Sequence, residues 1–219
     1  MKANNPALLE KFLNSMPLAF FEGIRDSIRS SYKEAHHRGF DDPAWGQAES
    51  DYLTPHIRRA IVEKVVRDVA NKNGLVAKTQ ENSKKTSEYT LVKADDFLFT
   101  ISHSANGGKV NPAKFRSQNA ELNSLLSQAS FEGEQFDSNY VFSNTVEGIY
   151  AILIHGADFD KTTPSFIDFA FPDSEKNEWL DRFGIDDLIT AKRSAITINE
   201  IEDDNAFPIP RRKRNDQGE

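Results

Sequence analysis

The chain has 219 residues and no cysteine, which excludes disulfides, thiolate zinc sites and cysteine nucleophiles. Its net charge of −7 is uneven: residues 54–128 carry 12 bases and 7 acids, whereas residues 129–219 carry 9 bases and 19 acids. No apolar run approaches the roughly 18 residues of a membrane span, and the first residues lack a signal-peptide core. We therefore expect a cytoplasmic protein with no membrane partner.

Helices are predicted in the first third of the chain. Asn5 and Pro6 are typical of a helix start, because asparagine caps a helix and proline is tolerated at its first position. A second helix is predicted to stop at Gly39, and residues 40–53 are expected to form a loop. The clearest helix is predicted to begin at Thr54, since apolar residues then recur at helical spacing. They are Ile57, Ile61, Val62, Val65, Val66 and Val69.

Strands dominate the second half. Residues 89–92 and 97–101 predict a pair of strands joined by a short turn. Further strands are predicted over residues 140–142, 148–154, 165–171 and 195–199. Helices are expected after Asn111-Pro112, with Phe115, Leu122, Leu125 and Leu126 facing inward, and over residues 174–183 and 186–193. Residues 76–87 are polar and are interpreted as a connector.

This order of elements predicts an α+β fold, in which N-terminal helices precede a mostly antiparallel β-sheet with interspersed helices. We divide the chain into a helical N-terminal section, residues 1–53, and an α+β core domain, residues 54–200. Residues 201–219 are charged and contain proline, so they are expected to be a disordered tail.

The segment GIYAILIHGADFD, residues 148–160, ends a predicted strand at His155 and continues to Asp158 and Asp160. Imidazole and carboxylate groups are ligands for Mn²⁺, Zn²⁺ or Mg²⁺. His103 follows the strand over residues 97–101 and meets His155 if the two strands are neighbours. These four side chains are the candidate catalytic site of a metal-dependent hydrolase or nuclease. The alternative is a turn in which Asp158 accepts backbone N–H bonds.

Two nuclease-like motifs are incomplete. Gly148-Ile149-Tyr150 matches the first tripeptide of the GIY-YIG nucleases, but no tyrosine follows Tyr150, so strand residues are expected. Pro172-Asp173 resembles the start of a PD-(D/E)xK motif, but no acid-x-lysine triplet follows Asp173. Either Asp173 or Ser174 is then expected to cap a helix.

A further metal cluster is conceivable at His36 and His37, with Asp41 and Asp42 close by in the sequence. Adjacent residues of a helix point roughly 100° apart, so the two imidazoles cannot easily grip one ion. A solvated helix end is the alternative.

Residues 54–85 are basic and indicate contacts with nucleic-acid phosphates. Three pairs at i,i+4 spacing are expected to neutralise one another on a solvated helix face, namely Arg59–Glu63, Glu63–Arg67 and Lys64–Asp68. The nucleic-acid candidates are the remaining cations of this region and of the tail: Arg58, Lys72, Lys78, Lys84, Lys85, Arg211, Arg212, Lys213 and Arg214. Base-stacking aromatics are not interleaved with them, and a solubilising role is the alternative.

Several stretches together resemble a group of small bacterial proteins whose activity is not established. They are EYTLVKADDFLFTISHS, the helix with Lys114-Phe115-Arg116, GIYAILIHG and FIDFAFPD, and the resemblance covers about residues 50–185. Those proteins occur in mobile-element, defence or toxin–antitoxin neighbourhoods. The resemblance implies a regulatory or neutralising partner protein and brings no catalytic residues.

The sequence holds no complete catalytic constellation and neither of the glycine-rich nucleotide-binding loops, so we expect no cofactor. The leading hypothesis is a non-enzymatic, protein-binding regulator, a component of a bacterial defence or toxin–antitoxin-like system. It rests on the opposed charge blocks and on strands able to present an edge to another protein. The alternatives are the metal-dependent hydrolase or nuclease and a DNA-binding regulator that uses residues 54–85.

Overall fold

The computed structural model describes residues 5–82, 85–105, 110, 113–124, 148–157, 161–174 and 178–205, with side chains up to residue 197 in the last segment. Its elements are α1 (Pro6–Asn14), α2 (Leu18–Phe40), α3 (Gln47–Lys72), β1 (Val76–Glu81), β2 (Glu88–Ala94), β3 (Phe97–His103), α4 (Lys114–Ala120), η1 (Glu121–Asn123), β4 (Ile149–Gly156), β5 (Phe166–Pro172), β6 (Trp179–Gly184) and α7 (Ile185–Asn205).

The strands form one six-stranded sheet in the order β1-β2-β3-β4-β5-β6. Every neighbouring pair is antiparallel except β3 and β4, which are parallel. Helices precede the sheet and interrupt it, so the predicted α+β class with a mostly antiparallel sheet is confirmed. Among the described helices, none is both long and apolar enough to cross a membrane.

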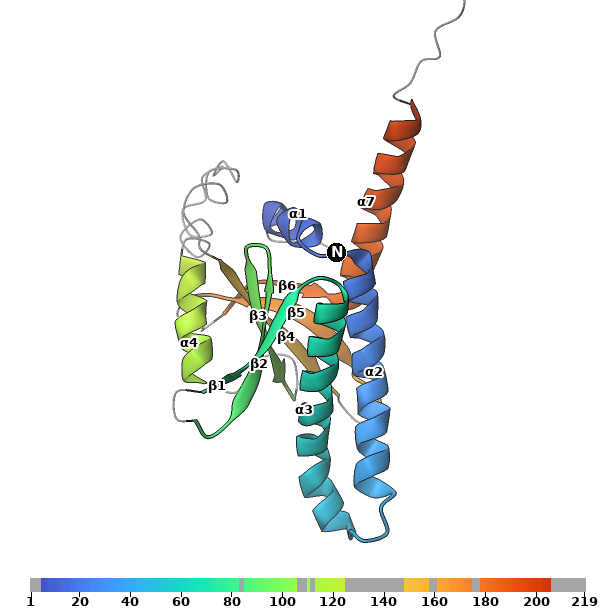
Figure 1. The fold of residues 1–219 in the computed structure, drawn as a ribbon, viewed down its shortest axis with the longest axis vertical. Coiled ribbons are helices and arrows are strands. Elements are labelled where there is room, and N and C mark those ends of the chain that lie inside the picture. Colours follow the sequence, from blue (N-terminus) through green and yellow to red (C-terminus); the bar gives the residue numbers. More distant parts are fainter. Residues whose placement is uncertain are drawn as a thin grey trace, which may run out of the picture.

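Helices cover the two faces of the sheet unequally (Figure 1). α1, α2, α3 and α7 contribute to a large core on one face, and α4 packs on the other face over a smaller cluster around Tyr150 and Ile152. The strand residues alternate between these cores, as the pleat requires. On β3, Phe97 and Phe99 belong to the large core, whereas Leu98 packs against the small one.

Phe12 of α1 lies at the centre of the large core and is fully buried. Its ring centroid lies between 4.9 and 6.3 Å from five other phenylalanine rings. These are Phe21, Phe97, Phe169, Phe171 and Phe183. The edge-to-face arrangements among them are favourable beyond the burial of area. These ring contacts fix α1 to strands β3, β5 and β6.

The start of α1 is as predicted, with the Asn5 side chain accepting a hydrogen bond from Leu8 N at 3.0 Å. Two other helix limits were predicted wrongly. Gly39 is not the stop of α2, which continues to Phe40; the glycine is needed because α2 and α3 approach so closely there that a Cβ would collide with Thr54. Thr54 does not begin α3 either: its hydroxyl donates to the Ser50 carbonyl one turn earlier at 2.7 Å.

Three other elements correct the sequence-based prediction. Residues 76–81 form edge strand β1 rather than a connector. The backbone of this strand bonds to β2, and its side chains are mostly exposed, so the strand forms without a hydrophobic face. Residues 179–184 form β6 rather than a helix, since Asp181 and Phe183 point inward at the period of a strand. Residues 195–199, predicted as a strand, belong to α7. The predicted strand at 140–142 lies outside the described residues.

The N-terminal helices and the sheet share one hydrophobic core, which draws residues from α1, α2, α3 and the strands. The proposed boundary between residues 53 and 54 falls within α3. The proposed tail begins at residue 201, and α7 continues to Asn205. Residues 206–219 lie outside the described part of the chain.

We predict that Phe12→Ala lowers the free energy of unfolding by about 3–5 kcal/mol, because it removes a ring that five others contact. Urea unfolding followed by circular dichroism measures this change. Tyr52→Ala is the matched control, since Tyr52 is 69% exposed and its loss is expected to cost less than about 0.5 kcal/mol. Equal effects of the two substitutions would contradict the central position of Phe12.

Candidate functional site

His103 and His155 lie side by side at the ends of the one parallel strand pair. The register aligns His103 of β3 directly with His155 of β4, and their ring centroids are 5.6 Å apart. Each lies an even number of residues after core residues Phe99 and Leu153, so both imidazoles point to the α2–α3 face. The structure therefore brings together the two histidines that the strand ends predicted.

Gly156 permits this end of β4 to pack closely. A Cβ at Gly156 would collide with the Ser104 carbonyl and with the ring of Phe166. The Ser104 amide, just beyond His103, donates to the His155 carbonyl at 2.9 Å. Because Gly156 has no side chain, β3 and β4 remain hydrogen-bonded one residue beyond the two histidines.

His155 is held by α2 and lies next to a cation from α3. Its Nδ1 lies 2.7 Å from the hydroxyl of Tyr32, and both residues are buried. The Arg58 guanidinium lies 4.4 Å from the centroid of the Tyr32 ring, a cation–π contact, and donates to the Lys161 carbonyl at 3.1 Å. Arg58 is only 6% exposed, and no described residue accepts a hydrogen bond from its Nε.

These surroundings keep both imidazoles neutral near neutral pH. Burial, together with smaller contributions from the neighbouring His103 and Arg58, lowers the pKa of His155 to about 3. Burial, followed by the positive charge of Arg58, also lowers the pKa of His103. His103 is the more exposed of the two and faces open space. It is therefore the histidine that can meet a ligand in its unprotonated form.

The sheet divides next to His103. Strand β2 remains paired with β1 as far as Glu88, but its pairing with β3 ends at Leu91 and Thr100. β3 remains paired with β4 as far as His103. Residues 88–90 and 101–103 therefore diverge, and we call this place the fork.

Side chains bond to the backbone where the strands have parted. The Glu63 carboxylate of α3 accepts from Thr90 N at 2.8 Å, and Arg59 donates to the Glu88 carbonyl at 3.1 Å. Arg116 of α4 donates to the Ile101 carbonyl at 3.1 Å. These bonds satisfy polar backbone groups at the fork, which explains why the strands separate without a large cost.

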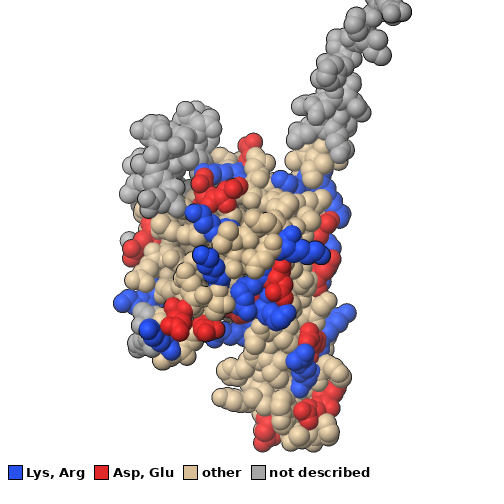
Figure 2. Space-filling model, in the orientation of Figure 1, with Lys and Arg blue, Asp and Glu red and all other residues tan. Residues whose placement is uncertain are grey.

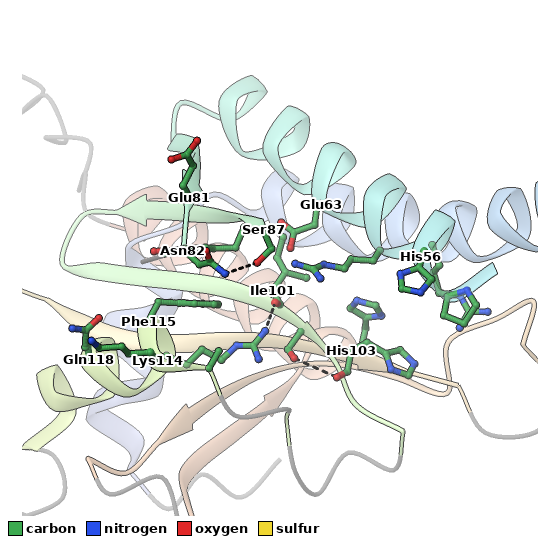
Figure 3. A pocket seen from close by; sticks show the side chains of 18 residues that line it. His56, Glu63, Glu81, Asn82, Ser87, Ile101, His103, Lys114, Phe115 and Gln118 are labelled. Carbon is green, nitrogen blue, oxygen red and sulfur yellow. Dashed lines mark hydrogen bonds between the residues drawn. The ribbon is translucent and has the colours of Figure 1, made fainter. Parts of the chain in front are cut away.

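A cavity of about 750 Å³ occupies the fork and is reached by residues from both faces of the sheet. Figure 3 shows Glu63 and His56 approaching from α3, Phe115 from α4, and His103 at the end of β3. We call it the fork pocket. The charged residues in its lining are four cations, Arg58, Arg59, Lys114 and Arg116, and two acids, Glu63 and Glu81. The pocket is therefore predominantly basic.

Glu63 does not form the solvated ion pairs that its spacing predicted. It faces β2 and is partly removed from water, which raises its pKa. Arg67, its expected partner, donates to the Thr90 hydroxyl at 2.8 Å. Of the three predicted i,i+4 pairs, only Lys64–Asp68 forms an ion pair among the described residues, at 2.7 Å.

The nucleic-acid candidates are spread over different parts of the molecule. Arg58 is buried beside Tyr32, whereas Lys72, Lys78 and Lys85 are exposed on α3, β1 and the turn after β1. Figure 2 shows basic and acidic side chains intermingled on the face in view, without one continuous basic surface. Lys84 and the tail cluster at residues 211–214 lie outside the described residues.

The proposed metal ligands Asp158 and Asp160 also lie outside the described residues. Within the described part, no group of three or more histidine, aspartate or glutamate side chains could hold a metal ion. His37 contacts Asp41, and His36 stacks on Phe40 with ring centroids 4.6 Å apart. The two imidazoles thus have separate partners.

The incomplete nuclease motifs have structural positions. Tyr150 of the GIY tripeptide is buried in β4, and its hydroxyl lies 2.6 Å from that of Thr100. Strand β6 occupies residues 179–184 of the region predicted as a helix after Asp173, and Asp173 N donates to the Glu178 carbonyl at 3.1 Å.

Sequence reasoning missed Tyr32, Glu63 and Arg116 as members of the site. Tyr32 lies at helical spacing from the apolar residues Ile24 and Ile28, which is typical of a core position, and Glu63 was assigned to a solvated helix face. Arg116 was noticed only within the Lys114-Phe115-Arg116 stretch. A weak signal existed for Arg58, because it follows Ile57 on the boundary of the apolar face of α3.

Comparisons with known proteins add no assignment. No protein-family model, curated protein or solved structure matches the chain. The geometry of the fork pocket is therefore the basis for assigning a function.

We predict that His155 makes the fold sensitive to acid. The unfolded chain binds a proton at this residue below about pH 6.5, whereas folded His155 remains neutral down to a pKa of about 3. Stability is therefore lost as pH falls through this window, by up to about 1.4 kcal/mol per pH unit from this group. Urea unfolding at several pH values measures the slope.

His155→Gln retains a polar side chain opposite Tyr32 but cannot titrate, so its stability should depend less on pH below 6.5. His36→Gln is the control, since it leaves the buried imidazole in place and should keep the steeper dependence. Identical slopes for the wild type and His155→Gln would show that His155 is not held neutral by burial.

Proposed function

We propose that this protein binds an organic anion, carrying phosphate or carboxylate groups, in the fork pocket. The observation that carries the proposal is the four cations, against two acids, around one cavity of about 750 Å³. Small-molecule sites commonly have volumes of about 300–1,000 Å³ and a few convergent polar groups. The fork pocket has both properties.

The positive charge of two arginines is not offset by an ion pair. Among the described residues, Arg58 and Arg59 bond to backbone carbonyls, and neither forms a salt bridge. The Arg58 side chain is buried away from water, and this burial lowers its pKa. An anion in the pocket would stabilise that charge, and charge-assisted bonds from guanidinium groups suit phosphate and carboxylate oxygens.

Pyrophosphate is a suitable first probe, and isothermal titration calorimetry measures its binding. Arg59→Gln and Arg116→Gln are each expected to weaken binding about tenfold or more, since hydrogen bonds to charged groups contribute about 1.5–3 kcal/mol. Arg59 is exposed, so its substitution tests the pocket without disturbing the core.

Arg29→Gln is the matched control. Arg29 is an exposed arginine of α2 that bonds to Asp186 at 3.0 Å and does not line the fork pocket. It removes the same charge from the protein at another place. Equal weakening by Arg29→Gln and Arg59→Gln, or absence of binding to the wild type, would overturn the proposal.

Binding should also strengthen as pH falls. In the free protein the pKa of His103 is lowered by burial and by Arg58. A bound anion beside His103 raises that pKa, so the complex takes up a proton and is favoured at lower pH. Sulfate, whose charge is constant over the pH range of histidine titration, is the appropriate probe. His103→Gln should remove this pH dependence, and its persistence would exclude His103 from the site.

A protein-binding role is a second proposal, supported by the edge of the sheet. Among the described strands, β1 pairs with β2 alone, and five of its six residues are exposed, including Val76. An exposed edge can accept a strand from a partner. A regulatory role in a bacterial defence or toxin–antitoxin-like pair would use such a surface. Size-exclusion chromatography of the protein captured from its source cell tests this role, and a monomer without partner counts against it.

The metal-dependent hydrolase and the DNA-binding regulator remain further hypotheses, and each has its own test. A metal-dependent hydrolase would need Asp158 or Asp160 beside the two histidines, and a raised melting temperature on addition of Mn²⁺ or Zn²⁺ would support it. DNA binding through Lys72, Lys78 and Lys85 would weaken steeply with salt.

A further inference from the structure

We infer that the anion recognised by the fork pocket is a nucleoside phosphate. This inference rests on the proposed anion-binding function and adds the class of molecule. It follows from the aromatic and polar groups that share the pocket with the cations. Neither of the glycine-rich phosphate loops occurs in the sequence, so guanidinium groups take the place of a backbone cradle.

The pocket has an aromatic wall made by Tyr89 of β2 and Phe115 of α4. Their rings stack with centroids 3.8 Å apart and an interplanar angle of 7°. The Tyr89 hydroxyl donates to Gln80 at 2.9 Å, which fixes the orientation of the tyrosine ring. Both residues line the cavity and are only partly buried. A planar base can pack against such a wall, and base–aromatic stacking does not require a particular base.

Polar side chains without charge surround the aromatic wall. Asn82, Ser87, Ser102 and Gln118 line the same cavity, and the Asn82 amide donates to the Ser87 hydroxyl at 2.8 Å. Figure 3 shows Asn82 and Ser87 on the strand side of the pocket and Gln118 on α4 near Phe115. Amide and hydroxyl groups are suited to the edges of bases and to ribose hydroxyls.

The cations continue from the aromatic wall to the histidines. Arg116 lies 5.2 Å from the centroid of the Phe115 ring and also reaches the Ile101 carbonyl on β3. Figure 3 shows His103 at the other end of the pocket from Phe115, and the positive charge of Arg58 acts on His103 there. A cavity of about 750 Å³ is much larger than inorganic phosphate requires. A ligand with a planar base at one end and a phosphate at the other matches this order of groups.

Calorimetric titrations with ribose 5-phosphate and with the four common nucleoside 5′-monophosphates test the inference. At least one nucleoside monophosphate is expected to bind tenfold or more tightly than ribose 5-phosphate, since stacking contributes about 1–3 kcal/mol per base. Phe115→Leu, which keeps an apolar side chain on α4, should reduce this preference to less than about threefold. It should weaken the binding of ribose 5-phosphate less than that of the nucleoside monophosphate, because it removes the stacking surface and no cation.

Tyr52→Leu is the matched control, because Tyr52 is exposed on α3 and does not line the pocket. It should alter neither affinity. Equal binding of ribose 5-phosphate and every nucleoside monophosphate would overturn the nucleoside assignment and leave the anion site in place. Failure of all these probes and of pyrophosphate would overturn both. A single-stranded oligonucleotide that binds far more tightly than any monophosphate would overturn the assignment to a small molecule.

Discussion

The parallel pairing of β3 and β4 is the constraint on which the candidate site depends. Among the described strands, this is the one neighbouring pair whose two C-terminal ends, and therefore His103 and His155, lie at the same edge of the sheet. Antiparallel pairing would separate the two imidazoles by the length of a strand. The central position of β4, all of whose residues are buried, holds this register rigidly. Any function that needs both histidines thus depends on the parallel pairing of these two strands.

The fork is the second consequence of the same arrangement. β3 follows β4 to His103, while β2 follows β1, so the sheet opens between them. Glu63, Arg59 and Arg116 bond to backbone groups that have lost strand partners, and the same residues line the pocket. Their roles in folding and in ligand binding are therefore linked. A ligand anion that draws on Arg59 or Arg116 competes with the backbone carbonyls these residues now hold.

Local patterns explain which parts of the fold could be predicted. The paired strands β2 and β3 and the buried strand β4 follow from apolar residues and turn residues that are adjacent in sequence. β1 was missed because an edge strand with polar side chains has no hydrophobic period. The prediction of a helix near residue 179 was wrong because the apolar residues there fit the period of a helix or of a strand. Pairing with β5 makes this segment a strand.

In the candidate site, too, local sequence patterns predict some features and tertiary packing decides the others. His103 and His155 were predicted together because each follows a strand, and the register confirms that they are neighbours. The burial of Arg58 could not be read from α3 alone, because it depends on Tyr32 of α2. Likewise, the contact of Glu63 with β2 depends on where β2 leaves β3. Tertiary packing determines whether these charged residues are solvated, and i,i+4 spacing by itself does not.

Histidine side-chain NMR during a pyrophosphate titration tests the central claim most directly, because it reports where the anion binds. We expect the resonances of His103 to shift and its pKa to rise, because the anion lies beside it in the fork pocket. His36 and His37, which lie near the C-terminal end of α2 and do not line the fork pocket, should remain unchanged, and Arg59→Gln should weaken the His103 response. A response at His36 and His37 with none at His103 would contradict the assignment of the fork pocket as the anion site.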